Sequence, residues 1–287
     1  MFSEVFSLAT RTFGDVTASV DSGHIGIAEI NRPPDNFFDA DLIGSLADAY
    51  EWLCGDGVRA IVLSSVGKNF CAGADFTGRS AQGRSEQGRS EQDPSMQGRS
   101  RQARLSSGGA GELYEQAFRL FQVPVPVVAA VQGAAVGGGL GLACAADFRV
   151  ASPQSRFSAN FARIGLHQGF ALTVTLPGIV GQQSAAELLY TGRRIGGEEA
   201  ARIGLTDRLV DPGQLHAAVH DLAAEIASAA PLAVRAIRAT MRAGLADQAR
   251  AAMERELSEQ RKLWPTADFA EGVRAVAERR PARFEGR

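Results

Sequence analysis

Two glycine-rich stretches decide the fold: Phe-Cys-Ala-Gly-Ala-Asp-Phe at residues 70–76 and Ala-Ala-Val-Gly-Gly-Gly-Leu-Gly at residues 134–141. Each follows an apolar, β-branched run, residues 60–63 before the first and residues 126–131 before the second. This order predicts a strand and then a turn whose small residues let backbone N–H groups approach a ligand closely. Two such donors that converge on one point form an oxyanion hole, which stabilises negative charge on a carbonyl oxygen.

The paired turns resemble those of the crotonase superfamily, the enoyl-CoA hydratases and isomerases. The resemblance implies that the N–H groups of Ala74 and Gly138 hold the thioester oxygen of an acyl-CoA. It runs nearly end to end, because matching segments also occur at residues 30–33, 147–151, 190–193, 199–205 and 278–284.

The fold that this resemblance implies is α/β, the crotonase/ClpP-like spiral of ββα units. We expect a crotonase core over residues 1–195 and a C-terminal helical trimerisation region over residues 196–287. The resemblance also implies a homotrimer or a homohexamer built from two trimers, since the helical tail packs on neighbouring subunits.

The composition limits what the chain does. It has 287 residues, 45% of them hydrophobic, which is enough for a sizeable core. The net charge of −2 gives no signal for nucleic acid, and no apolar run approaches the roughly 20 residues that span a bilayer. Cys54, Cys71 and Cys144 cannot all pair and lack metal-ligand spacing. We expect no nucleic-acid partner, no membrane partner, no metal and a cytoplasmic location.

The pattern along the chain predicts alternating strands and helices, followed by a helical tail. Residues 15–20 and 24–30 alternate around a turn and predict a β-hairpin. A helix is predicted from Asp39 to Trp52, and strands over residues 58–64 and 126–131. From about Ser184 onward the pattern is almost entirely helical. Its long helices begin at Pro231 and run from Ala249 to Leu263.

A low-complexity insertion at about residues 78–109 is foreign to this scheme. A Gly-Arg-Ser-x-Gln unit recurs there with a five-residue period and contains almost no apolar residue to bury. One interpretation is a surface loop grown by repeat expansion. The other is that its arginines cover the site entrance or meet CoA phosphates, because the loop leaves directly from the first glycine motif.

The usual proton carriers of the family are replaced in this chain. Enoyl-CoA hydratases carry two glutamates, and the matching positions here are Gly141 and Phe161. Neither residue can transfer a proton, so hydration by a carboxylate pair is not supported. A dinucleotide-binding fingerprint counted from Gly137 is excluded as well, because residue 142 is leucine.

His167 is the candidate replacement, since histidine titrates near neutrality and it follows the lost second glutamate. The alternative is a structural histidine that fixes a glycine-flanked turn. Glu112 and Glu115 are further candidates, although carboxylates at a helix start are usually dipole partners. The resemblance predicts a substrate- and CoA-binding set made of Arg32, Ala72, Ala74, Asp75, Phe161 and Arg279. Coenzyme A is part of the substrate, and no separate cofactor is expected.

Two functions remain open. One is an enzyme that stabilises a thioester enolate with non-standard acid and base residues. The other is a protein that binds or shuttles acyl-CoA without turnover. Hydrolysis of a carbon–carbon bond in a diketone also occurs on this fold, but it uses histidines and only His167 lies near the site. Dehalogenation of halobenzoyl-CoA is disfavoured, because the required aspartate would fall near Gly169.

Overall fold

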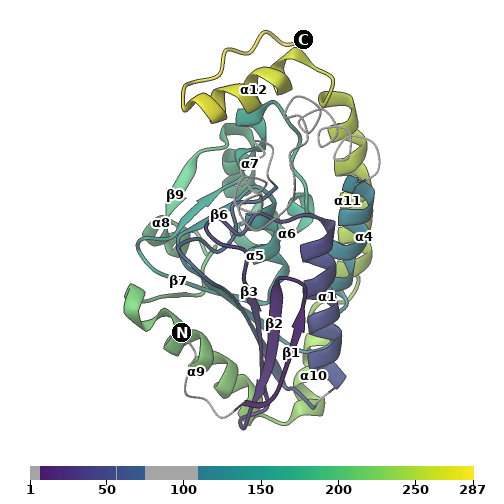
Figure 1. Cartoon of the computed structure of the whole chain (residues 1–287), viewed down its shortest axis with the longest axis vertical. Helices are drawn as coiled ribbons and strands as arrows, with labels where there is room; N and C mark the ends of the chain where they lie inside the picture. The colour runs from purple at the N-terminus through teal and green to yellow at the C-terminus, as the bar shows by residue number, and fades with distance from the viewer. Residues whose placement is uncertain (1–6, 56, 75–108) are drawn as a thin grey trace, which may run out of the picture.

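The computed structural model describes residues 7–55, 57–74 and 109–287, with a seven-stranded sheet at its centre (Figure 1). The sheet order is β1-β2-β3-β4-β5-β7-β10. The first three strands pair antiparallel and the remaining neighbours pair parallel, so the chain crosses over between them. The strands are β1 (Ser7–Phe13), β2 (Val16–Asp21), β3 (Ile25–Ile30), β4 (Ala60–Ser65), β5 (Val127–Val131), β7 (Phe148–Ala151) and β10 (Arg208–Leu209).

A three-stranded sheet lies beside the turns that follow β4 and β5. It consists of β6 (Ala134–Val136), β8 (Arg156–Ser158) and β9 (Arg194–Gly196), in the order β6-β8-β9. Two isolated bridges, Phe38 with Ala74 and Cys71 with Ala135, join the first glycine motif to its surroundings. The second bridge ties the first motif directly to the strand that leads into the second.

The central sheet is buried on both faces because its strands send alternate side chains to two hydrophobic cores. From β4, Ile61 and Leu63 enter the larger core together with α1 (Ala40–Gly55), whereas Ala60 and Val62 face α9 (Leu215–Ser228). All six residues of β4 are buried. Strands covered on both faces read as continuous apolar runs, which is the pattern of residues 60–63.

Most of the predicted elements are confirmed. The hairpin is β2 and β3, and the predicted strands are β4 and β5. Helix α1 begins where expected because the Asp39 carboxylate accepts the Leu42 amide at 2.9 Å, which caps the helix. Strand β1 was not predicted. The insertion at about residues 78–109 lies outside the described residues, apart from Gly109, the first residue of α4 (Gly109–Phe121).

The chain after residue 196 is mostly helical, but part of it completes the core. Strand β10 extends the central sheet, and α9 covers one of its faces (Figure 1). The helices of the second half are α5 (Gly138–Ala145), α6 (Leu172–Val180), α7 (Gln182–Thr191), α8 (Gly197–Arg202), α10 (Pro231–Met241), α11 (Leu245–Leu263) and α12 (Ala267–Glu278), with short 3-10 helices η2 (Asn160–Ile164) and η3 (Pro212–Gln214). Of the described helices, no single one is long and apolar enough to cross a bilayer, although the pair 212–228 and 231–241, bent by 106°, meets the length and composition criteria together.

Candidate active site

The two glycine turns lie against each other. Gly73 has a φ of +85°, and a Cβ there would lie 2.6 Å from the Val136 carbonyl oxygen and 3.5 Å from the Gly138 nitrogen. Gly137 has a φ of +57°, and its amide donates to the Ser158 carbonyl at 2.8 Å. Only glycine tolerates both the left-handed backbone and this close approach. The turns predicted from sequence are therefore brought together.

Two backbone amides at this contact are free to bind a ligand. Gly138 is the first residue of α5, where helical N–H groups have no partner within the helix. Over the described ranges, neither the Gly138 amide nor the Ala74 amide donates a backbone hydrogen bond. Both residues line the same cavity. The arrangement can stabilise negative charge on an oxygen, and the positive end of the α5 dipole adds to this effect.

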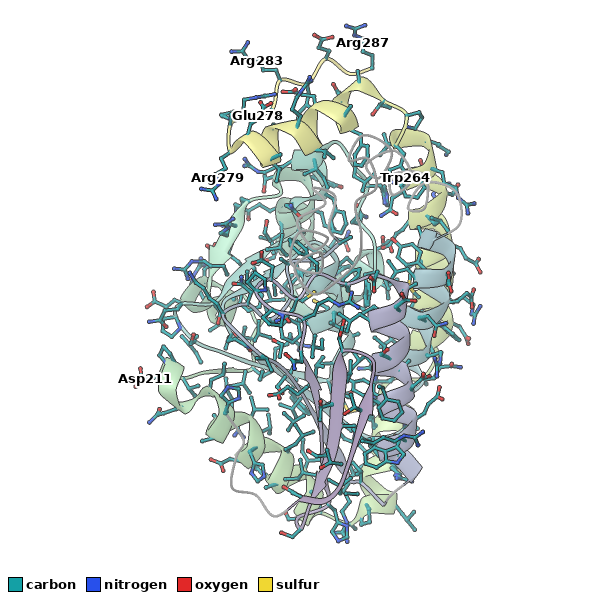
Figure 2. All side chains as sticks on the ribbon, in the orientation of Figure 1. Asp211, Trp264, Glu278, Arg279, Arg283 and Arg287 are labelled. Carbon is teal, nitrogen blue, oxygen red and sulfur yellow. The ribbon has the colours of Figure 1, made fainter. Side chains whose placement is uncertain are left out.

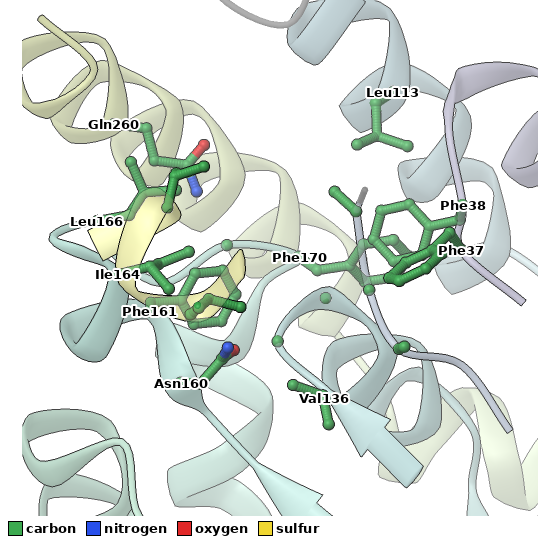
Figure 3. A pocket seen from close by; sticks show the side chains of 18 of the residues that line it. Phe37, Phe38, Leu113, Val136, Asn160, Phe161, Ile164, Leu166, Phe170 and Gln260 are labelled. Atoms are coloured by element: carbon green, nitrogen blue, oxygen red, sulfur yellow. The ribbon is translucent and has the colours of Figure 1, made fainter. Parts of the chain in front are cut away.

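The cavity in front of these amides has a volume of about 360 Å³ and is mainly apolar (Figure 3). Phe38 and Phe170 form part of its wall, with their ring centroids 5.4 Å apart. Phe161 and Leu166 come from η2 and the segment after it, and α12 contributes Val273. Such a surface suits an acyl chain better than a charged group.

The positions of the two family glutamates carry no carboxylate, and one of them has no room for a side chain. A Cβ on Gly141 would lie 2.6 Å from the Cβ of Phe170 and 3.0 Å from its carbonyl oxygen. Phe161 is 7% exposed and lines the cavity. Its ring also lies beside the second turn, since a Cβ on Gly137 would be 3.8 Å from Phe161 Cζ.

Sequence reasoning missed a polar group on α4 that reaches the cavity. The Tyr114 hydroxyl donates to Gln260 Oε1 at 3.2 Å, and the Phe170 amide hydrogen-bonds to the same hydroxyl. A Cβ on Gly169 would lie 2.2 Å from that hydroxyl oxygen. Burial raises the pKa of Tyr114, and the nearby Glu256 carboxylate raises it further. The phenol is therefore a hydrogen-bond donor at neutral pH, not a base.

Glu256 holds the backbone that shapes this wall. Its fully buried carboxylate accepts the Ala171 amide at 2.9 Å and the Thr173 amide and hydroxyl at 3.0 and 2.6 Å. Phe170 and Ala171 both have left-handed backbones, with φ of 60° and 58°. Burial raises the pKa of Glu256 to about 7, against the opposing effect of these hydrogen bonds. No short motif predicts this group, because it comes from α11, far along the chain.

His167 is not among the residues that line the cavity. Its Nδ1 lies 2.9 Å from the carbonyl oxygen of Gln168, and its own carbonyl accepts the Gln260 amide at 3.1 Å. The structure thus shows His167 fixing the turn before Gly169, and its role as an acid or base stays a prediction.

Neither acidic candidate at the start of α4 faces the cavity. Glu112 is exposed, and Glu115 is also exposed and forms an ion pair with Arg250 at 3.5 Å. Both have the surroundings expected of solvated helix-start carboxylates.

The predicted CoA-binding residues are not all brought together. Ala72 lines the cavity beside Ala74, but Asp75 lies outside the described residues. Arg32 is held by Asp15 at 2.6 Å and by Asp39 at 2.8 Å, and it does not line the cavity.

Two other arginines lie closer to solvent. Arg279, at the end of α12, points away from the helix (Figure 2). Exposed Arg194 on β9 lines the cavity and was not predicted.

Comparison with known proteins agrees with this geometry. The family described as enoyl-CoA hydratase/isomerase matches residues 21–287. A crotonyl-CoA hydratase from Syntrophomonas wolfei is 33% identical, over 91% of this chain and 94% of its own. Crystal structures of an enoyl-CoA hydratase/isomerase from Pseudoalteromonas atlantica T6c and an enoyl-CoA hydratase from Mycobacterium avium subsp. paratuberculosis K-10 are also similar. Their TM-scores are 0.77 and 0.76, at 27% and 25% identity, and they cover 94% and 95% of this chain and 100% and 99% of their own.

These proteins share the crotonase fold that the two turns predict. The chain belongs to the enoyl-CoA hydratase/isomerase family.

Proposed function

We propose that this protein binds an acyl-CoA thioester and stabilises the enolate formed from it, with the N–H groups of Ala74 and Gly138 holding the thioester oxygen. The observation that carries this proposal is the pair of amides, without backbone partners in the described chain, that face one apolar cavity. Charge accumulates on the thioester oxygen when a proton leaves Cα or a nucleophile adds at Cβ. Each preorganised donor contributes about 3 kcal/mol to such a transition state.

The proton carrier of this reaction is not one of the family's two glutamates. The ionisable residues that line the described cavity are Asp35, Tyr114 and Arg194. Asp35 lies on the Ala72 side, where its carboxylate accepts the Asn69 amide at 2.8 Å and its carbonyl accepts the Ala72 amide at 2.9 Å. Tyr114 is kept neutral by its raised pKa and can donate, but not abstract, a proton at neutral pH.

A second function, binding of acyl-CoA without turnover, is favoured by one observation. The Gly141 position is filled by Phe170 and not by a carboxylate or a water site that a carboxylate would hold. Stabilisation of the thioester oxygen would then tighten binding without a subsequent proton transfer.

One experiment separates the two functions. Purified protein is incubated with crotonyl-CoA and with longer and branched enoyl-CoAs, and turnover and affinity are measured on the same samples. Turnover supports the enzyme, and tight binding without turnover supports the carrier. Loss of turnover with retained binding in His167→Ala would establish the histidine as the proton carrier.

The oxygen site itself is tested by infrared spectroscopy of bound butyryl-CoA that is ¹³C-labelled at the thioester carbonyl. Two N–H donors polarise that carbonyl, so its stretching frequency falls below the value for the free thioester. A bound thioester with an unshifted carbonyl contradicts the assignment of Ala74 and Gly138.

The remaining CoA contacts and the assembly follow the family resemblance. We propose that Arg279 meets CoA phosphates, since it is exposed and forms no ion pair within the described residues. Arg32 keeps that role only if it leaves the two aspartates that now hold it. We also propose a homotrimer, or a hexamer of two trimers, in which the exposed apolar face of α10 is covered.

A further inference from the structure

We propose that the side-chain carboxamide of Asn160 binds an oxygen substituent on C3 of the acyl chain, so that 3-hydroxyacyl thioesters bind more tightly than saturated ones. This inference rests on the proposed binding of acyl-CoA at Ala74 and Gly138. It adds a specificity-determining residue that differs from both positions of the missing glutamates.

The backbone around Asn160 is fixed from two sides. The Gly137 amide donates to the Ser158 carbonyl at 2.8 Å, and the Ser158 hydroxyl donates to the Gly192 carbonyl at 3.1 Å. A Cβ on Gly192 would lie 3.3 Å from the Cα of Asn160. Asn160 then begins η2. Its side-chain direction is therefore set by the fold and not by a mobile loop.

The carboxamide lies next to the turn that presents the Gly138 amide. A Cβ on Gly137 would be 3.1 Å from Asn160 Oδ1. Figure 3 shows the carboxamide between the Phe161 ring and the segment after Val136, on the cavity side of η2. When the thioester oxygen is held at Gly138, C3 lies only two carbon atoms beyond the carbonyl carbon. Asn160 thus borders the region of the acyl chain where C3 would be placed.

This carboxamide has no hydrogen-bond partner among the described residues, although it is partly buried in an apolar wall. Leaving a buried amide unsatisfied is costly, whereas a ligand oxygen placed there supplies the missing partner. An amide carries one acceptor and two donor hydrogens and stays neutral, so it matches a hydroxyl, which both donates and accepts. It cannot transfer a proton, and its role is to bind and orient.

The other polar groups that line the cavity are already engaged or lie elsewhere. Tyr114 donates to Gln260, and Asp35 accepts from Asn69. Arg194 is exposed on β9. Of these, the Asn160 carboxamide has both a free hydrogen-bonding capacity and a position beside the second glycine turn.

The test compares butyryl-CoA with each enantiomer of 3-hydroxybutyryl-CoA by isothermal titration calorimetry. One hydrogen bond to a neutral group corresponds to about 3- to 10-fold in affinity, so we expect one enantiomer to bind that much more tightly than butyryl-CoA. Asn160→Leu, of similar size, should abolish this preference and leave butyryl-CoA affinity within about 2-fold. Recovered thioesters are analysed by chromatography. If dehydration occurs, the KM of the hydroxy thioester is compared with the Ki of butyryl-CoA.

Gln168→Leu is the matched control, because its carboxamide contacts Thr173 and does not line the cavity. It should retain the preference. Asn160→Ala provides a second variant if the leucine side chain disturbs folding. A preference that survives both Asn160 substitutions, or its absence from the unmodified protein, overturns the inference. Failure of every CoA thioester to bind the unmodified protein contradicts the proposed function instead.

Discussion

Gly141 shows at the level of one residue why the missing carboxylate is a structural feature of this chain. The glycine lies within α5, and any Cβ there collides with Phe170, a residue with its own constrained backbone. Overpacking of this kind typically costs about 1–3 kcal/mol. A glutamate cannot be returned to this position unless Phe170 moves.

We therefore expect Gly141→Ala to lower the free energy of unfolding by about 1–3 kcal/mol in urea denaturation. The matched control is Gly178→Ala, in exposed α6, where a Cβ meets no atom within 4 Å. It should stabilise the protein by about 0.5–1 kcal/mol, because alanine has less backbone freedom to lose than glycine. Equal effects of the two substitutions would contradict the contact between Gly141 and Phe170.

Glu256 predicts a pH dependence of stability. Its pKa is about 7 in the folded protein and near 4.5 in the unfolded chain, because burial penalises the charged form. The folded state therefore binds the proton more tightly. The associated stability is fully present below pH 4.5 and is lost as the pH rises to about 7, with a total change on the order of 3 kcal/mol.

Glu256→Gln isolates this effect because glutamine does not titrate. The difference in unfolding free energy between the unmodified protein and Glu256→Gln should fall from pH 4.5 to 7 and stay constant above about pH 8. Urea denaturation at a series of pH values measures it. A difference that does not change with pH would show that the carboxylate ionises normally despite its burial.

The order of elements was predictable because it depends on local patterns. The alternation of residues 15–30 and the apolar runs before each glycine motif identify β2 to β5, and a capping aspartate identifies α1. Strand β1 was missed because its polar alternation resembles that of a loop. The two turns were predicted as a pair because glycine is required there for backbone reasons, which a short motif records.

The rest of the site was not predictable from local patterns. Asn160, Tyr114 and Glu256 are single polar residues on three distant elements, and only tertiary packing makes them neighbours of the cavity or its wall. A lone polar residue gives no periodic signal. His167 illustrates the converse, since its residue type indicates chemistry while its position places it outside the cavity lining.

Helix α12 closes one side of the cavity of its own chain, through Val273 and Val276. It approaches η2 very closely, because a Cβ on Gly272 would lie 2.5 Å from the backbone carbonyl carbon of Ile164. The backbone of η2 cannot yield as a flexible side chain would. The position of this helix therefore depends on glycine at residue 272.

We expect Gly272→Ala to displace α12 and weaken its docking by about 1–3 kcal/mol. Amide hydrogen exchange within residues 267–278 should accelerate by about 5- to 100-fold, and butyryl-CoA affinity should fall. Gly178→Ala again serves as the control, with unchanged exchange in α12. Unaltered exchange in Gly272→Ala would show that the helix accommodates the methyl group in place.

At the scale of the whole molecule, α10 has two unlike faces. Its inner face carries three arginines spaced by three and four residues. Arg238 and Arg242 contact Asp147 at 3.0 Å, and Arg235 donates to the Val58 carbonyl. These contacts fix the orientation of the helix. None of its residues is buried within the chain, and Leu232, Ile237 and Met241 are 80%, 59% and 82% exposed.

Contiguous exposed apolar side chains on a rigidly held helix are typical of a protein–protein contact, and the family resemblance assigns this region to self-association. We predict that Ile237→Glu together with Met241→Glu converts the assembly to monomers, because burying two carboxylates against an apolar partner surface is costly. Sedimentation velocity measures the mass in solution. Asp211→Lys, an exposed charge change on η3 at the other end of α9, should leave the assembly intact. Because both substitutions point to solvent in the single chain, the double variant should keep its folded circular dichroism spectrum. A folded double variant that still sediments as a trimer or hexamer would place the subunit contact on another face.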